Sequence, residues 1–155
     1  MRIIAGANKG RTLKTPKWDG LRPTSDKLRE TLFNILQARI EGARVLDVFA
    51  GTGAVALITE NAALCRESER CAIIRDVAPR ALKHPLPGGP FDIVVLDPPY
   101  DFTDLDEAVR DAAGQRAADG IVILEHALRV TPPQPDGLTL TRTVKSGDSA
   151  LTFYS

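Results

Sequence analysis

The sequence predicts an α/β fold in which helices flank a mostly parallel β-sheet, and two observations lead to this prediction. First, from residue 44 onward, short apolar runs alternate with segments of helical periodicity. Second, the runs are apolar at consecutive positions, which is typical of strands buried on both faces of a doubly wound sheet. The four runs are RVLDVFA, CAIIRDV, FDIVVLD and GIVILEH.

The length and composition fit one domain. With 155 residues, 43% of them hydrophobic and 26% charged, the chain is long enough to bury a core. We expect a single domain over residues 1–155, which comprises a basic arm at 1–24, a capping helix at 25–42 and the catalytic sheet at 44–155.

The N-terminal segment is expected to form a basic arm or β-hairpin, because glycine and proline interrupt short extended pieces. Residues 1–44 contain ten Lys and Arg against four Asp and Glu, whereas the remainder contains ten against sixteen. Such a cationic segment favours a nucleic-acid partner, although an ordinary solvated surface has the same composition. The candidate RNA-binding cations are Arg2, Lys9, Arg11 and Lys14.

The capping helix has start and stop signals at its ends. Ser25 or Asp26 is suited to cap its first turn, and Gly42 is suited to end it. Apolar residues between them recur at helical spacing, so one face of the helix should pack on the sheet. At the other end of the chain, LTLTRTV and ALTFYS flank a Lys-Ser-Gly-Asp turn and predict an antiparallel hairpin at the sheet edge.

The first candidate site is a glycine turn between the first apolar run and a helix. Gly51 and Gly53 permit a tight turn and close approach of a ligand to the backbone. A dinucleotide fingerprint requires a third glycine, which is Ala56 here, and Asp47 in the strand would repel a pyrophosphate. An acid in that place suits an ammonium group, as in the amino-acid end of S-adenosylmethionine. The alternative is a turn that serves packing alone.

The second candidate site is Asp97-Pro98-Pro99-Tyr100, which follows an apolar run and should lie at the carboxyl end of a buried strand. The two prolines make the loop rigid, and they leave neighbouring carbonyls able to accept hydrogen bonds from an amine. The Asp97 carboxylate is a second acceptor, and the Tyr100 ring offers a face for a planar base. Accepting the hydrogens of an exocyclic amine localises its lone pair for attack on a methyl sulfonium.

Together these segments resemble the bacterial RsmD-type 16S ribosomal RNA guanine-N2 methyltransferases. The resemblance covers the whole chain and is carried by MRIIAG, KGR, RPTSDKLRETLFNIL, VLDVFAGTGA, FDIVVLDPPY, ILEH and ALTFY. It implies a seven-stranded Rossmann-like class I methyltransferase fold, S-adenosylmethionine as cofactor, and a guanine of small-subunit ribosomal RNA as substrate.

The resemblance also implies roles for individual residues. The methionine end of the cofactor would contact Asp47, Phe49, Gly51, Thr52 and Gly53. Asp76 resembles the residue that contacts the adenine amine, with a helix cap as its alternative, and Arg22, Thr24 and Ser25 belong to a segment that closes over the cofactor. His126, next to Glu125, would bind RNA or support the loop at 97–100.

The sequence departs from the family pattern after the glycine turn. In this class of sheet an acid about 20 residues beyond the turn, at the end of the second strand, bonds the ribose hydroxyls. Here CAIIRD directly follows a single helical segment, so the second strand is missing. The acids in between are Glu60, Glu67 and Glu69, and none of them follows an apolar run.

Other classes of protein are disfavoured. Cys65 and Cys71 form no CxxC pair and have no histidine nearby, so we expect no metal site. With neither a signal peptide nor an apolar run of about 18 residues, we expect a cytoplasmic protein, and a monomer. Two alternative functions are methylation of an adenine N6 in DNA or of a protein glutamine, and RNA binding without catalysis.

Overall fold

The computed structural model describes residues 2–3, 6–15, 26–50 and 55–155. The chain divides into two compact units, one formed by residues 1–23 and 50–75 and the other by residues 24–49 and 76–155. None of the helices in the described ranges combines the length and apolar character needed to span a bilayer.

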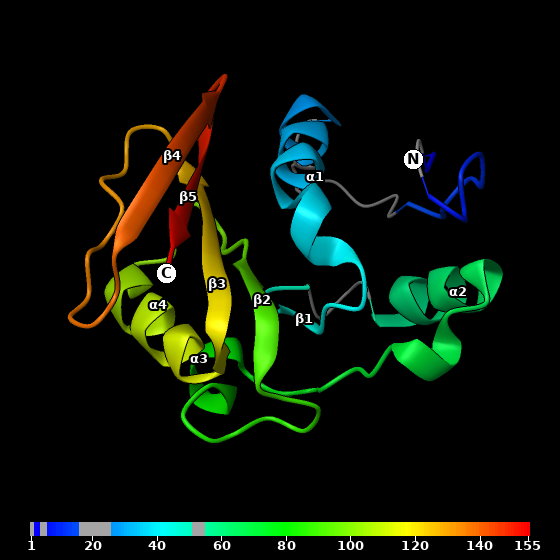
Figure 1. The fold of residues 1–155 in the computed structure, drawn as a ribbon, viewed down its shortest axis with the longest axis horizontal. Coiled ribbons are helices and arrows are strands. Elements are labelled where there is room, and N and C mark those ends of the chain that lie inside the picture. The colour runs from blue at the N-terminus through cyan, green and yellow to red at the C-terminus, as the bar shows by residue number, and fades with distance from the viewer. Residues whose placement is uncertain (1, 4–5, 16–25, 51–54) are drawn as a thin grey trace. The chain divides into compact units, whose positions relative to one another are not determined.

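The larger unit contains a five-stranded sheet in the order β1-β2-β3-β5-β4 (Figure 1). Its strands are β1 (Val45–Asp47), β2 (Phe91–Leu96), β3 (Arg116–Ala127), β4 (Leu140–Ser146) and β5 (Ser149–Tyr154). The first three pair in parallel, and β5 pairs antiparallel with both β3 and β4. The predicted α/β class is confirmed, with parallel pairing among the first three strands and a C-terminal antiparallel hairpin.

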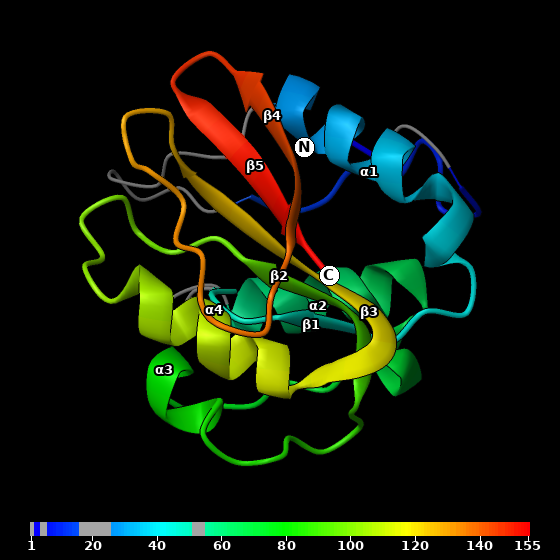
Figure 2. The same ribbon diagram turned by 60° about the vertical axis from the view of Figure 1, so that its left-hand side comes forward.

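Helices cover both faces of this sheet, with α1 (Asp26–Ile40) on one face and α4 (Leu105–Gly114) on the other (Figure 2). Successive residues of β2 point to opposite faces, so Ile93 packs with the α1 side and Val94 with the α4 side. The short helix α3 (Ala78–Ala81) precedes β2. Burial on both faces explains why β2 and β3 are apolar at consecutive positions.

The predicted capping helix is confirmed. Leu28 and Leu36 of α1 are buried against β2, β3 and β5, and Gly42 follows the helix with a φ of +73°. The C-terminal hairpin turns at Gly147, whose φ of +59° lies in the left-handed region that glycine adopts without strain. Tyr154, at the end of β5, is fully buried and donates a hydrogen bond to the Pro133 carbonyl.

The smaller unit contains the N-terminal arm, the helix α2 (Val55–Cys65) and the 3₁₀ turn η2 (Ser68–Arg70). The arm folds back on itself through a single antiparallel bridge between Arg2 and Thr12. Two backbone bonds support the bridge, from the Ile3 N–H to the Arg11 carbonyl and from the Gly10 N–H to the Ile3 carbonyl. In the described residues of the arm, the expected hairpin is represented by this one bridge, without a strand.

One predicted strand is wrong. The run CAIIRDV forms no strand, and Ile73, Ile74 and Val77 remain exposed. The physical reason is the missing partner, since an apolar run becomes a strand only where a neighbouring strand satisfies its backbone groups. The sheet of the described residues accordingly has five strands rather than the seven that the resemblance implied.

Candidate functional site

Two carboxylates lie at the ends of neighbouring parallel strands. Asp47 is the last residue of β1, and Asp97 directly follows β2. Partial loss of solvent raises the pKa of Asp47 above its usual value, the Asp97 carboxylate raises it further, and a hydrogen bond from the Phe49 N–H lowers it. Because Asp47 stays exposed at the sheet edge, the loss of solvent is incomplete. The pair is an acidic site that a cation would stabilise.

The predicted loop at 97–100 lies at the carboxyl end of β2. Pro98 is buried and anchors it, whereas Asp97 and Pro99 are exposed. The Phe102 N–H donates to the Pro99 carbonyl at 2.9 Å, which closes a turn after the motif. One of the carbonyls that we expected to be available to an amine therefore already has a partner. The Asp97 side chain at this loop is exposed.

Two contacts hold the aromatic side chains beside this loop. The Tyr100 hydroxyl forms a hydrogen bond with the Ser149 hydroxyl at the start of β5. The Phe49 ring meets the Phe102 ring edge to face, with 5.3 Å between centroids and 69° between planes. The predicted cofactor residue Phe49 is thus packed against the end of the 97–102 loop, within the same unit.

Glu125 and His126 are buried in β3 beside the loop. The His126 ring is 4% exposed, with Nε2 2.9 Å from the Thr152 hydroxyl and Nδ1 3.0 Å from the Ala127 carbonyl. Both residues line a hollow of about 10 Å³ next to Pro98, Pro99 and Tyr100, which is about the room for one water molecule. Of the two roles expected for His126, this position favours support of the loop over contact with RNA.

Asp76 lies just before α3. Its Oδ1 accepts hydrogen bonds from the Val77 N–H at 2.7 Å and from the Arg80 guanidinium, with which it forms an ion pair. These bonds hold the pKa of Asp76 below its usual value, the Arg80 bond having the larger effect. The alternative role of Asp76 as a helix cap is not present, because Val77 is the N-cap of α3 and no side chain caps that helix. Its contact with a cofactor stays a prediction.

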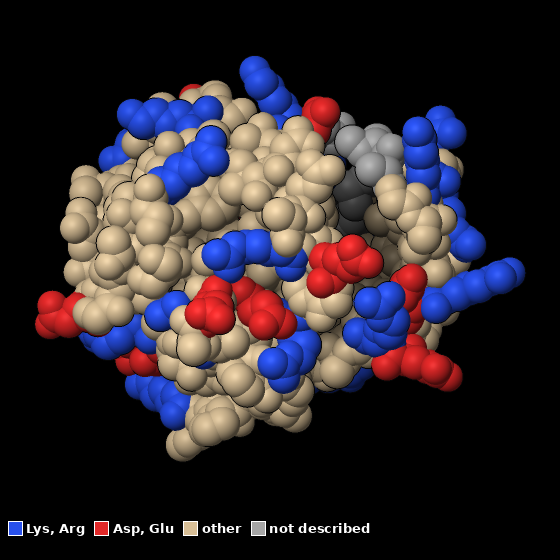
Figure 3. Space-filling view, viewed as in Figure 1, with Lys and Arg blue, Asp and Glu red and all other residues tan. Residues whose placement is uncertain are grey.

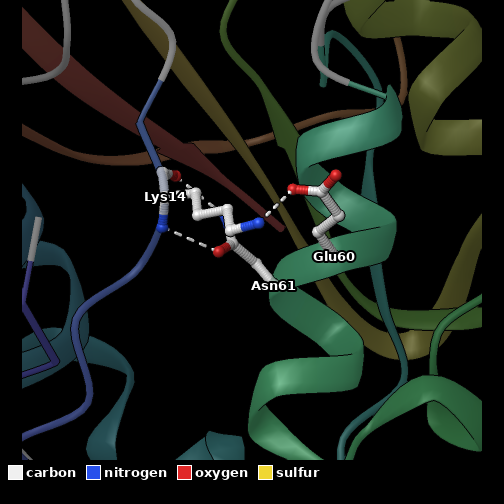
Figure 4. Close-up of polar contacts among 3 residues, drawn as sticks. All are labelled: Lys14, Glu60 and Asn61. Carbon is white, nitrogen blue, oxygen red and sulfur yellow. Dashed lines mark hydrogen bonds and ion pairs between the residues drawn. The ribbon is translucent and has the colours of Figure 1, made fainter.

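The basic arm is bound to α2 within the smaller unit (Figure 4). Lys14 forms an ion pair with Glu60 at 2.9 Å. The Asn61 amide holds the backbone of Lys14 on both sides, accepting from its N–H at 2.9 Å and donating to its carbonyl at 3.0 Å. Arg11 donates to the Leu64 carbonyl. Two of the four predicted RNA-binding cations thus also fasten the arm.

The remaining two cations are more open. Arg2 donates to the Gly10 carbonyl at 3.3 Å, which leaves part of its guanidinium exposed, and Lys9 is exposed in the turn of the arm. On the face drawn in Figure 3, basic and acidic side chains are interspersed, without separation into regions of one sign. Contact of Arg2 and Lys9 with RNA stays a prediction.

Several predicted residues lie outside the described part of the chain: Arg22, Thr24, Ser25, Gly51, Thr52 and Gly53. Among the residues that are described, no group of three His, Cys, Asp or Glu side chains is placed to hold a metal ion. Three side chains of the site were missed by the sequence reasoning, namely Asn61, Ser149 and Thr152. Their contacts join residues distant in sequence, and no local pattern marks them.

Comparison with known proteins supports the resemblance over the whole chain. The family model of conserved hypothetical protein 95 matches residues 1–83 and 54–155. The chain is 32% identical to ribosomal RNA small subunit methyltransferase D of Escherichia coli, over 99% of this chain and 89% of that protein.

Solved structures give the same fold. The Escherichia coli protein yhhF, which is described as a methyltransferase, is 29% identical with a TM-score of 0.80, over 99% of this chain and 96% of that one. The 16S rRNA N2 G1207 methyltransferase RsmC of Thermus thermophilus, in complex with AdoMet and guanosine, shares the fold at 19% identity and a TM-score of 0.54. That match covers 88% of this chain and 44% of RsmC. The chain therefore belongs to the family of conserved hypothetical protein 95, the family of the ribosomal RNA small subunit methyltransferases D.

Proposed function

We propose that this protein transfers a methyl group from S-adenosylmethionine to the exocyclic N2 of a guanine in small-subunit ribosomal RNA. The observation that carries the proposal is the Asp97-Pro98-Pro99-Tyr100 loop at the carboxyl end of β2, next to Asp47, in a chain of this family. Such a substrate places the enzyme in the cytoplasm, with the ribosome.

The loop has the groups that a guanine amine needs. Asp97 is exposed and accepts a hydrogen bond from the amine, which draws its lone pair out of the ring. The turn closed by Phe102 and the burial of Pro98 fix the position of this acceptor. The loop therefore loses little conformational entropy when the base binds. The Tyr100 ring, held by Ser149, provides a stacking face worth about 1–3 kcal/mol per base.

The amino-acid end of the cofactor fits the residues that are present. Partial loss of solvent and, to a lesser extent, the neighbouring Asp97 disfavour the ionised form of Asp47. An ammonium group bound there would stabilise that ionised form. When bound, the cofactor supplies an electrophilic methyl group. The chain's own contribution is to hold the base amine at Asp97 and to keep the loop rigid.

The test is methyl transfer at a high concentration of cofactor. Purified protein is incubated with S-adenosylmethionine labelled in its methyl group and with small subunits from cells that lack the modification, and nucleosides are analysed by mass spectrometry. Label in N2-methylguanosine is expected. Absence of label at millimolar cofactor would overturn the proposal, and label in an adenine of DNA or a protein glutamine offered in parallel would redirect it.

A matched pair of variants tests the role of the loop. Asp97→Asn loses the carboxylate charge and should reduce kcat by about a hundredfold or more, as loss of one preorganised electrostatic group commonly does. Asp101→Asn removes an exposed carboxylate four residues further on and should leave the rate unchanged. Equal effects of the two substitutions would show that Asp97 has no special role.

A further inference from the structure

The region around the missing strand determines how the ribose of the cofactor is bound. The inference drawn from it rests on the proposed function, in which S-adenosylmethionine is the cofactor. In open α/β sheets with a glycine turn, an acid about 20 residues beyond the turn bonds the ribose hydroxyls, and it follows the second strand. In this chain the first apolar run after α2, residues 71–75, is in no strand. Ile73 and Ile74 in that segment are 37% and 42% exposed, which is unlike the buried strands β2 and β3.

The β1 edge of the sheet also lacks a neighbouring strand in the described part of the chain. In the described part of the chain, β1 pairs with β2 and with no other strand, and it has three residues. Val45 of β1 is 54% exposed, whereas Ile93, its partner in β2, is 1% exposed. An apolar strand with one open edge is the expected result when its neighbour is removed from a sheet.

Of the four acids in residues 54–76, three have partners elsewhere, and the fourth, Glu69, is exposed in η2. Glu60 forms an ion pair with Lys14, and Glu67 bonds Arg70 and the Asn8 amide. The carboxylate of Asp76 is bonded to Arg80. None of these acids follows a strand in the structure.

The comparison with relatives locates the missing stretch. The alignment with the Escherichia coli methyltransferase D runs over 180 positions, so at least 25 of them have no counterpart in a chain of 155 residues. The two matches of the family model overlap between residues 54 and 83. A stretch of this length, absent from this interval, is enough for a strand with a flanking helix.

We infer that this chain has Asp47 for the amino-acid end of S-adenosylmethionine but lacks the acid that bonds its ribose, which belongs to the stretch absent beside β1. The cofactor therefore loses a carboxylate that accepts two charge-assisted hydrogen bonds from ribose. The loss of two such bonds raises the dissociation constant at least about a hundredfold relative to a complete family member.

The experiment measures cofactor binding rather than activity. S-adenosylmethionine is titrated by calorimetry into this protein and into the Escherichia coli relative. Two insertion variants are compared with them: one carries the relative's own residues at the alignment gap, and the other carries a glycine-serine stretch of equal length. Thermal unfolding of each sample establishes that it is folded before titration.

The unaltered chain is expected to bind S-adenosylmethionine weakly. The relative's segment should restore tight binding, and the glycine-serine stretch should not. Binding by the unaltered chain as tight as that of the relative would overturn the inference, and so would failure of the folded chimera to gain affinity. Glu69→Gln removes an exposed acid of the same segment and should leave the binding of the unaltered chain unchanged. A marked loss would overturn the inference, because Glu69 would then replace the missing acid. Methyl transfer at millimolar cofactor tests the proposed function independently, since weak binding and catalysis are compatible at that concentration.

Discussion

The hydrogen bond between Tyr100 and Ser149 links the amine-binding loop to the C-terminal hairpin. The effect of removing this bond on the Tm and on kcat/KM can be predicted. Tyr100→Phe retains the stacking ring but lacks the hydroxyl, and Ser149→Ala retains the strand backbone but lacks the partner. If the bond fixes the Tyr100 ring, each substitution frees the same side chain. The double variant should then have the same Tm and the same kcat/KM as either single variant.

The magnitude follows from the type and burial of the bond. Both partners are neutral hydroxyls in half-buried positions, for which a net contribution of about 0.5–1.5 kcal/mol is typical. For a chain of this length, a loss of about 1 kcal/mol lowers the Tm by about 2–4 °C. The same loss, expressed in the binding of the base, lowers kcat/KM for the RNA about fivefold, mainly through KM.

The assay is a double-mutant cycle with two readouts, thermal unfolding and methyl-transfer kinetics at saturating cofactor. A coupling of about 1 kcal/mol between the two positions is expected in both. Ser146→Ala, at the other side of the hairpin turn, is the matched control and should not couple with Tyr100. Additive effects of Tyr100→Phe and Ser149→Ala would refute the reasoning, because the two hydroxyls would then act independently.

Three further predictions concern single positions. Asp47→Asn should raise the Tm at pH 7, because a carboxyl whose pKa is raised on folding destabilises the folded state at a pH above its unfolded pKa of 3.8. This gain in Tm should vanish below pH 3.8, and the variant should lose cofactor binding at neutral pH. Asn61→Ala should free the arm from α2 and increase proteolysis within residues 6–15, whereas Lys14→Ala should do so less, because its ion pair is exposed. Gly120→Ala should lower the free energy of unfolding by about 1–3 kcal/mol, since its Cβ would lie 2.8 Å from a backbone oxygen, and Gly114→Ala, with open space around it, should not.

Much of the larger unit could be predicted because its elements have strong local signals. The strand β2 and the helix α1 combine apolar periodicity with a clear end, and the loop after β2 contains prolines that no strand interior tolerates. The segment 71–75 has an equally apolar sequence but no strand, because strand formation depends on a partner that a local pattern does not reveal.

The motifs of the site could be predicted from the sequence, but the residues that hold those motifs in place could not. Asp97 and Tyr100 are adjacent in the sequence to the prolines that mark them, whereas Ser149 contacts Tyr100 across 49 positions and Asn61 contacts Lys14 across 47. For His126 two roles were expected, RNA binding or support of the loop, and its burial beside Thr152 favours the second. Such contacts are set by strand order and register, which are properties of the whole sheet.

The core of the larger unit does not depend on the strand that the chain lacks. Its fully buried side chains come from α1, α4, β2, β3 and β5, whereas β1 adds only the partly buried Leu46. Removing a neighbour of β1 therefore exposes little of the surface that stabilises the fold, at about 25 cal/mol for each Å² of apolar area. The acid that bonds ribose, in contrast, stands on the missing strand itself. The same deletion should then leave the base-binding loop folded while it weakens cofactor binding, so stability and cofactor affinity are separable in this protein.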